Sequence, residues 1–212
     1  MSKDGFTLAW TDVWTLALTR PTPETYLQLL GDERRATNRA IFWLYFTSLV
    51  AVVVFVNSII GSPQSQEALL LALAQNGLDT EGVNVAQALF VSSLCVAPFS
   101  AILSVVGWMV LASVIQAFAN QVGERAHTAG KLQAYLYCLA AIVAPTTLVA
   151  TFFTIVPFLS FLSLAVTVYQ TYCLVRAAQG VYALEFRTAL TVVVAPVLAF
   201  FLVQLLFLGV AF

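Results

Sequence analysis

The sequence contains little charge and few residues with reactive side chains. Of its 212 residues only 9% are Asp, Glu, Lys or Arg, and it has one histidine and three cysteines. A water-soluble domain carries charge on about 25% of its residues, because its surface has to be hydrated. The chain lacks the material for such a surface, and we therefore expect its solvent to be largely lipid.

These shortages exclude several classes of protein. The formal net charge is −1 and the nine Lys and Arg are scattered, which argues against a nucleic-acid partner. The cysteines at positions 95, 138 and 173 lie in apolar runs, with no CxxC spacing and no histidine nearby. We therefore expect no metal site, no cofactor and no disulfide framework. An apolar content of 61% argues against a disordered chain.

Long uncharged runs take the place of the missing charge. A membrane-spanning helix needs about 20 mostly apolar residues. The expected fold class is all-α, a polytopic membrane protein with a cytoplasmic N-terminal segment at 1–39 and a five-helix transmembrane bundle at 40–212. The spans are expected at about 40–60, 85–119, 132–154, 157–175 and 188–211. The second is too long for one upright crossing, so Pro98 either kinks it or separates two pieces.

The positions of the basic residues predict an orientation. Cytoplasmic loops carry the excess of Lys and Arg, and tyrosine and tryptophan gather at the membrane interfaces. With five spans, all nine basic residues lie on the side of the N-terminus and of the loops at 120–131 and 176–187. Several tyrosines lie at the same span ends. We therefore expect a protein of the cell membrane, with its N-terminus in the cytoplasm and its C-terminus outside.

An amphipathic helix is expected ahead of the first span. Apolar residues recur at helical spacing between residues 6 and 18, and threonines line another face. Such a helix lies flat on the cytoplasmic membrane surface, with Trp10, Val13 and Trp14 as its membrane-interface residues. The alternative is that this face docks on the protein's own spans or on a partner.

The expected spans contain no ionisable residue. Buried ionisable groups mark proton relays, voltage sensors and sites for charged substrates, because they are costly to hold in lipid. The single histidine, His127, lies in a charged loop, and no catalytic motif accompanies it. We therefore expect a protein that is not an enzyme.

Neutral polar residues do enter the third and fourth spans, where they fall on one face of each helix. Small and hydroxylated side chains let membrane helices pack closely and hydrogen bond. Helix packing is one explanation of these faces, and a crevice for a small solute or a lipid head is the other. The residues are Thr147, Thr151 and Thr154 in the third span, and Ser160, Ser163, Thr167 and Gln170 in the fourth.

Five short segments together resemble the Ypt/Rab-interacting (Yip domain) family, in its bacterial form. They are 14–21 (WTLALTRP), 26–30 (YLQLL), 131–137 (KLQAYLY), 176–182 (RAAQGVY) and 187–190 (RTAL). The resemblance implies five spans with an external C-terminus, and no catalytic residue. Eukaryotic relatives take part in vesicle trafficking and bind small GTPases partly through longer N-termini. This N-terminal segment lacks their Asp-Leu-Tyr-Gly-Pro type of motif, so we do not carry GTPase binding over.

The function expected from these features is that of a non-enzymatic membrane protein that organises the membrane or acts as an adaptor or trafficking-like factor. Its expected partners are membrane lipids, together with other membrane proteins or further copies of itself. Two alternatives remain open. One is a small transporter or channel for a neutral or lipid-like solute, and the other is an accessory transmembrane subunit of a larger complex.

Overall fold

A computed structural model describes residues 7–32, 36–60, 63–75, 84–122 and 131–210 of the chain. Every regular element in these segments is a helix, which confirms the expected all-α class. In chain order they are α1 (Trp10–Thr19), α2 (Pro23–Leu29), α3 (Thr37–Ile60), α4 (Pro63–Gln75), α5 (Val85–Val122), α6 (Lys131–Ile155), the short 3-10 helix η1 (Pro157–Leu159), α7 (Ser160–Tyr182) and α8 (Phe186–Val210).

Several of these helices are long and apolar enough to cross a membrane. Among the residues whose side chains are described, four segments meet this criterion: Thr37–Ser58, Ser93–Val122, Lys131–Ile155 and Ser160–Tyr182. The corresponding part of α8, Phe186–Ala199, is apolar but shorter. The chain is thus built as a multi-pass membrane protein.

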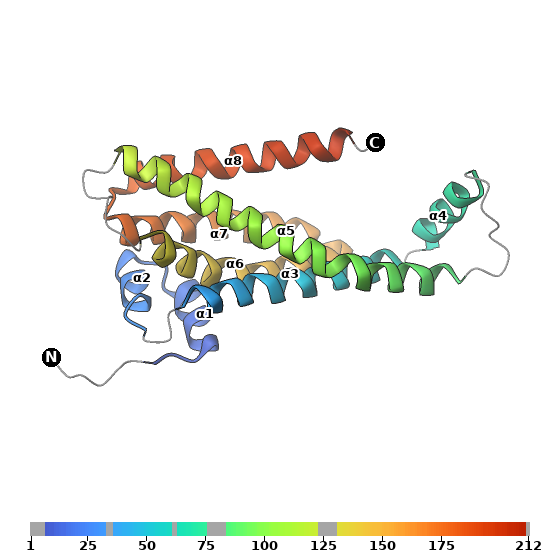
Figure 1. Cartoon of the computed structure of the whole chain (residues 1–212), viewed down its shortest axis with the longest axis horizontal. Coiled ribbons are helices and arrows are strands. Elements are labelled where there is room, and N and C mark those ends of the chain that lie inside the picture. Colours follow the sequence, from blue (N-terminus) through green and yellow to red (C-terminus); the bar gives the residue numbers. More distant parts are fainter. Residues whose placement is uncertain (1–6, 33–35, 61–62, 76–83, 123–130, 211–212) are drawn as a thin grey trace.

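Helix α6 forms the centre of the bundle. It contacts α1, α3, α5 and α7, and in Figure 1 it lies among them. Residues 134–146, nearly four turns in succession, are all buried. A helix that is apolar on every side is typical of such a central position. On the outside of the bundle, large side chains such as Phe99 and Leu164 are exposed, as lipid-facing positions require.

Helices α3 and α5 form another close pair in the bundle. The hydroxyl groups of Ser48 and Ser104 hydrogen bond between these helices at 2.9 Å. Small residues such as these allow membrane helices to approach and to satisfy each other's polar groups. The pair runs from the end of the molecule where α1 and α2 lie toward the end where α4 lies (Figure 1).

The two short helices α1 and α2 lie together at one end of the bundle, beside the start of α3 and the end of α7 (Figure 1). Helix α2 begins where its sequence favours a helix start. Thr22 accepts a hydrogen bond from the backbone N–H of Thr25 at 3.2 Å, and Pro23 occupies the first helical position. A threonine cap followed by proline supplies the missing partner of the first turn and the right backbone angle.

The courses of two helices, α5 and α7, add to or differ from what the sequence predicts. Helix α5 continues through Pro98 as a single element, which decides between the two alternatives for the second span. Helix α7 continues seven residues past the expected end at 175, to Tyr182, because a helix need not end where the hydrocarbon does. It ends at Ala183, whose φ of 56° is left-handed. Residues 63–75 of the expected loop at 61–84 form helix α4, whereas most of the loop at 120–131, His127 included, lies outside the described residues.

Candidate functional site

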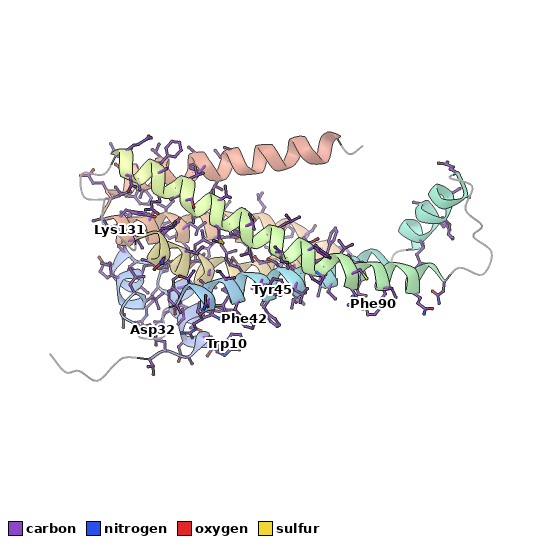
Figure 2. The ribbon with its side chains drawn as sticks, viewed as in Figure 1. Trp10, Asp32, Phe42, Tyr45, Phe90 and Lys131 are labelled. Atoms are coloured by element: carbon purple, nitrogen blue, oxygen red, sulfur yellow. The ribbon has the colours of Figure 1, made fainter. Side chains whose placement is uncertain are left out.

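A buried carboxylate organises the end of the bundle where α1 and α2 lie (Figure 2). The side chain of Asp32 is 0% exposed, and its Oδ2 accepts hydrogen bonds from Arg39 Nη1 and from the Tyr137 hydroxyl, each at 3.0 Å. Its Oδ1 accepts from the backbone N–H of Leu8 at 3.2 Å. A buried charge is tolerated only when it is paired and hydrogen bonded, and this one is both.

The same cluster ties together four separate parts of the chain. Leu8 precedes α1, Asp32 follows α2, Arg39 lies in the first turn of α3 and Tyr137 lies in α6. Arg39 closes the cluster, because its Nη2 also donates to the Leu8 carbonyl oxygen at 3.2 Å. Removing one partner of a buried ion pair typically costs about 3–5 kcal/mol. We refer to Leu8, Asp32, Arg39 and Tyr137 as the anchor cluster.

The sequence did not predict the anchor cluster, because charge was considered only inside the expected spans and, for the basic residues, as an indication of orientation. A usable signal was present. Asp32 and Glu33 directly precede Arg34 and Arg35 at the entrance to the first span, so opposite charges lie close together in the sequence. Its partner Tyr137, however, is 105 positions away, and no local pattern connects the two.

The hairpin made by α1 and α2 also packs directly on α6 and α7, and we call it the cap. Tyr26, 0% exposed, donates from its hydroxyl to the carbonyl oxygen of Ala17 at 2.9 Å. Arg176 Nε donates to the Pro21 carbonyl oxygen at 3.2 Å, and the Tyr169 hydroxyl donates to that of Leu18. The cap is therefore held by α7 along its length as well as by the anchor cluster.

Close packing of the cap requires a glycine in α7. A Cβ atom at Gly180 would lie 2.6 Å from the carbonyl oxygen of Pro23, which is closer than real Cβ contacts. Gly180 therefore lets the first turn of α2 rest directly on α7. Burial in this contact raises the pKa of the Tyr26 phenol well above its ordinary value, with the nearby Cys173 acting in the same direction.

The three expected membrane-interface residues have different surroundings. Val13 is 0% exposed and belongs to the protein core, whereas Trp10 is 49% exposed and Trp14 is partly buried. Val13 thus differs from the expectation, because α1 turns this position toward the protein's own helices, as in the docking alternative. Trp10 remains available to a membrane surface.

An aromatic row continues from α1 into the bundle. Trp10 packs edge-on against Trp14 with ring centroids 5.0 Å apart, and Trp14 against Trp43 at 5.9 Å. Trp43 in turn lies 5.5 Å from the ring of Tyr137, and the Arg39 guanidinium lies over Trp43 at 4.8 Å. The row and the anchor cluster therefore share Arg39 and Tyr137. Aromatic pairs in this geometry contribute about 0.5–1.5 kcal/mol each beyond their buried area.

The expected polar face of α6 is only partly enclosed. Thr147 and Thr151 are partly buried and Thr154 is exposed. The Thr151 hydroxyl donates to the Thr147 carbonyl oxygen at 2.7 Å, within its own helix. The Thr154 hydroxyl likewise bonds one turn back. These two hydroxyls donate to carbonyl oxygens of their own helix, and none of these hydrogen bonds joins α6 to α7.

The expected polar face of α7 follows the same pattern. Ser160 is exposed, and Ser163, Thr167 and Gln170 are partly buried. The Ser163 hydroxyl donates to the Ser160 carbonyl oxygen at 2.6 Å, and Thr167 to that of Ser163 at 3.0 Å. Within the described residues, the hydroxyl hydrogen bonds of these two faces therefore stay inside their own helices.

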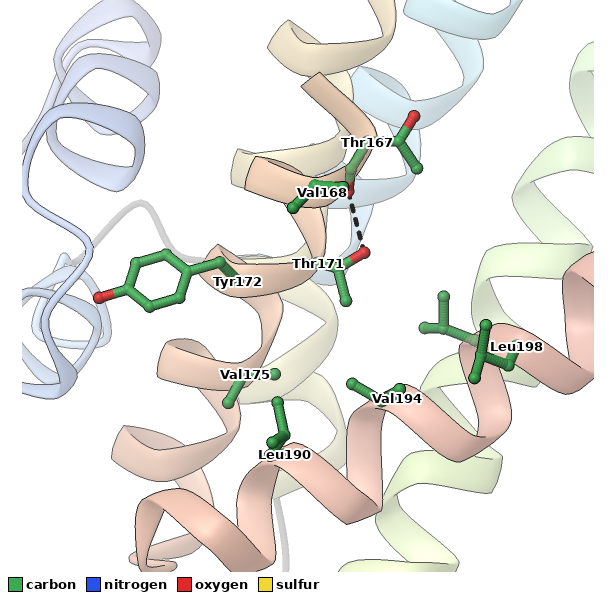
Figure 3. Close-up of a pocket in the computed structure, with 9 residues that line it drawn as sticks. Thr167, Val168, Thr171, Tyr172, Val175, Leu190, Val194 and Leu198 are labelled. Carbon is green, nitrogen blue, oxygen red and sulfur yellow. Dashed lines mark hydrogen bonds between the residues drawn. The ribbon is translucent and has the colours of Figure 1, made fainter. Parts of the chain in front are cut away.

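A groove of about 370 Å³ lies between α7 and α8 and includes one of these residues, Thr167. Figure 3 shows Thr171 and Val175 of α7 and Leu190 and Val194 of α8 along its walls. The Thr171 hydroxyl donates to the Thr167 carbonyl oxygen at 2.9 Å. The groove is therefore almost wholly apolar and suits a hydrocarbon chain better than a polar solute.

Within the described residues, no three His, Cys, Asp or Glu side chains gather where they could hold a metal ion. The three cysteines are free thiols, with Cys138 and Cys173 buried and Cys95 exposed. Cys138 and Cys173 thus pack as small apolar side chains in the core.

Comparison with known protein families gives a match over most of the chain. The Yip1 domain matches residues 17–208, which include the last three residues of α1, the anchor residues Asp32, Arg39 and Tyr137, and most of the membrane helices. Neither the comparison with curated proteins nor the comparison with solved structures gives a match.

Proposed function

Because the chain belongs to the Yip1 domain family, we propose that it is a non-enzymatic membrane protein that acts as an adaptor or organiser at the membrane surface. The cap is the observation that supports this role most. It is a folded hairpin outside the membrane-spanning helices, and both the anchor cluster and α7 hold it in place. A rigid surface of this kind is suited to binding a partner without a large ordering cost.

The cap also carries exposed apolar side chains. Leu27 on α2 is 53% exposed and Trp10 on α1 is 49% exposed. Partner surfaces are enriched in aromatic and apolar side chains at their centres. The proposed partner is therefore another membrane protein, or a second copy of this chain, that contacts the cap beside the membrane.

The proposed topology has five spans, of which α8 is the last. It is 25 residues long, or about 37 Å at 1.5 Å per residue, whereas the hydrocarbon core is about 30 Å thick. The proposed orientation places the cap in the cytoplasm. It is supported by basic residues at the helix ends that lie on the side of the cap. They are Arg20 after α1, Arg39 in the first turn of α3, Lys131 at the start of α6, Arg176 near the end of α7 and Arg187 at the start of α8.

Cysteine labelling tests this topology. In a background carrying Cys95→Ser, Cys138→Ala and Cys173→Ala, Gln75→Cys should react with an impermeant reagent added outside intact cells. Glu185→Cys should react only after permeabilisation, and a tag after Phe212 should be accessible from outside. A tag accessible only from the cytoplasm would contradict five spans.

A pair of neighbouring substitutions on α2 tests the adaptor role. Leu27→Asp and Gln28→Asp add the same charge to exposed positions, but only the first removes an apolar contact. We expect tagged full-length protein to co-purify with stoichiometric partners from native membranes, and Leu27→Asp but not Gln28→Asp to lose them. Equal recovery of partners with both variants would contradict a role for the cap.

The alternative function is a carrier for a neutral or lipid-like solute, and the groove between α7 and α8 is the observation that favours it. A carrier would purify alone and transport solute into liposomes. In that case Val194→Trp, which fills the groove, should stop the flux while Leu27→Asp leaves it unchanged. An accessory subunit would instead remain bound to one fixed complex.

A further inference from the structure

A second groove, with a volume of about 590 Å³, lies between α1 and the first three turns of α3. This volume is within the range of about 300–1,000 Å³ typical of ligand sites. Its walls combine three tryptophans and two phenylalanines with one cation. The lining residues that matter here are Trp10, Trp14, Arg39, Phe42, Trp43 and Phe46.

The cation in this groove is partly exposed, whereas its ion-pair partner is not. In the ion pair of Arg39 with Asp32, the arginine side chain is 18% exposed and the carboxylate is 0% exposed. Three hydrogen bonds to described groups use three of the five guanidinium N–H donors, on Nη1 and Nη2. Two donors are thus left for a ligand, and a phosphate is the group that an arginine fork fits best.

The other end of the groove is apolar and continues along the outside of α3. Phe42 is 61% exposed and Phe46 is 43% exposed, and their rings stack with centroids 6.0 Å apart. Both lie in the membrane-spanning segment that begins at Thr37. A ligand held at Arg39 would therefore extend its tail along two aromatic rings into the hydrocarbon.

The tryptophans fix the level of the groove at the membrane surface. Tryptophan is enriched at the boundary between headgroups and hydrocarbon, where its ring is partly in lipid and its N–H can meet polar atoms. Trp10 is half exposed in this wall, and the Nε1 of the partly buried Trp14 has no acceptor among the described residues.

We propose that this groove binds one membrane phospholipid, with its phosphate on Arg39 and an acyl chain along Phe42 and Phe46. The order of the groups in the wall, from guanidinium to indoles to phenyl rings, matches the order of phosphate, glycerol esters and hydrocarbon in such a molecule. The bound lipid would fill the space between the cap and the bundle. This inference requires that the protein lies in a membrane, but it does not depend on the proposed adaptor role.

Native mass spectrometry of the full-length protein in detergent tests the proposal, with dioleoyl phosphatidylglycerol as the probe. We expect one saturable lipid, with about tenfold weaker binding for Phe42→Ser. Phe152→Ser is the matched control, because Phe152 is 60% exposed on α6 and lies outside the groove. It should bind the lipid as the unmodified protein does. Equal affinities for Phe42→Ser and Phe152→Ser would overturn the proposal.

The phosphate contact has its own test. Arg39→Lys keeps a positive charge beside Asp32 but loses the planar fork, so it should weaken phosphatidylglycerol binding. Dioleoylglycerol, which has the same chains without phosphate, should bind weakly to the unmodified protein and to Arg39→Lys alike. Equal affinity for both lipids would overturn the assignment of Arg39. If Phe42→Ser abolishes a dimer and not lipid binding, the groove is instead an interface between two copies.

The lipid site and the proposed adaptor role can be tested independently of each other. Loss of lipid by Phe42→Ser with unchanged partner recovery would support the lipid site independently of the adaptor role. Loss of partners by Leu27→Asp with unchanged lipid binding would support the adaptor role independently of the lipid site.

Discussion

The hydroxyl group of Tyr137 donates a hydrogen bond of 3.0 Å to the buried carboxylate of Asp32, although the two residues are 105 positions apart in the chain. Tyr137 lies in the central helix α6, and Asp32 follows the cap. The bond thus connects the central helix of the bundle to a segment outside the helices that are long and apolar enough to cross a membrane. Together with the hydrogen bonds of Arg39 and Leu8, this bond makes the position of the cap depend on the positions of α3 and α6.

Tyr137→Phe should destabilise the protein while leaving its shape intact. The change removes one donor from a carboxylate that is 0% exposed, and a loss of this kind costs about 1–3 kcal/mol. Tyr172→Phe on the exposed face of α7 is the matched control and should be close to neutral. Thermal unfolding in detergent measures both, and equal midpoints for the two variants would contradict the role given to Tyr137.

The two tryptophans of α1 should differ in their importance for the cap. Trp14 packs between Trp10 and Trp43, whereas Trp10 is half exposed. Trp14→Ser should therefore make residues 6–20 sensitive to proteases in membranes while the membrane helices stay folded, and Trp10→Ser should do so less. Cleavage of this segment in the unmodified protein would show that α1 is not docked.

Gly180→Ala should push α2 away from α7. The new Cβ would meet the Pro23 carbonyl oxygen at 2.6 Å, and a backbone atom of this kind cannot move aside without shifting the helix. Overpacking typically costs about 1–3 kcal/mol. Gly31→Ala, where the nearest atom is 3.2 Å away, should have a smaller effect. Similar unfolding midpoints for both variants would contradict close packing at Gly180.

Alkaline pH should weaken the attachment of the cap through Tyr26. Burial raises the pKa of this phenol in the folded protein, so folding favours the protonated form. Its contribution to stability is therefore complete below the unfolded pKa of about 10 and falls as the pH rises above it. The stability advantage of the unmodified protein over Tyr26→Phe should shrink above pH 10 or so. An advantage that is independent of pH would contradict this assignment.

The membrane helices were predictable because their signal is local. Runs of about 20 apolar residues predict spans whatever their neighbours are, and the bounds of α3 and α6 lie within three residues of the expected ranges, whereas α7 ends seven residues later than expected. Details set by backbone geometry were not predictable. A proline in a long apolar run is compatible with a break or with a continuous helix, and only the fold shows that α5 continues through Pro98.

The candidate site was less predictable, because its contacts are long-range. The amphipathic pattern of α1 predicts a helix with an apolar face, but hydrocarbon and a protein core satisfy such a face equally well, and Val13 lies in the core. The polar stripes of the third and fourth spans led to a crevice as one explanation, yet hydroxyls such as that of Thr151 bond within their own helix. Single-helix periodicity cannot separate these cases.

The central claim is that the buried carboxylate of Asp32 holds the cap on the membrane bundle, and amide hydrogen exchange of the full-length protein in nanodiscs tests it most directly. Asp32→Asn keeps the shape but removes the charge that pairs with Arg39. Asp12→Asn, at an exposed position of α1, is the matched control. We predict that Asp32→Asn speeds exchange throughout residues 10–29 while residues 134–146 stay protected, and that Asp12→Asn changes neither. Unchanged protection of the cap in Asp32→Asn would contradict the claim.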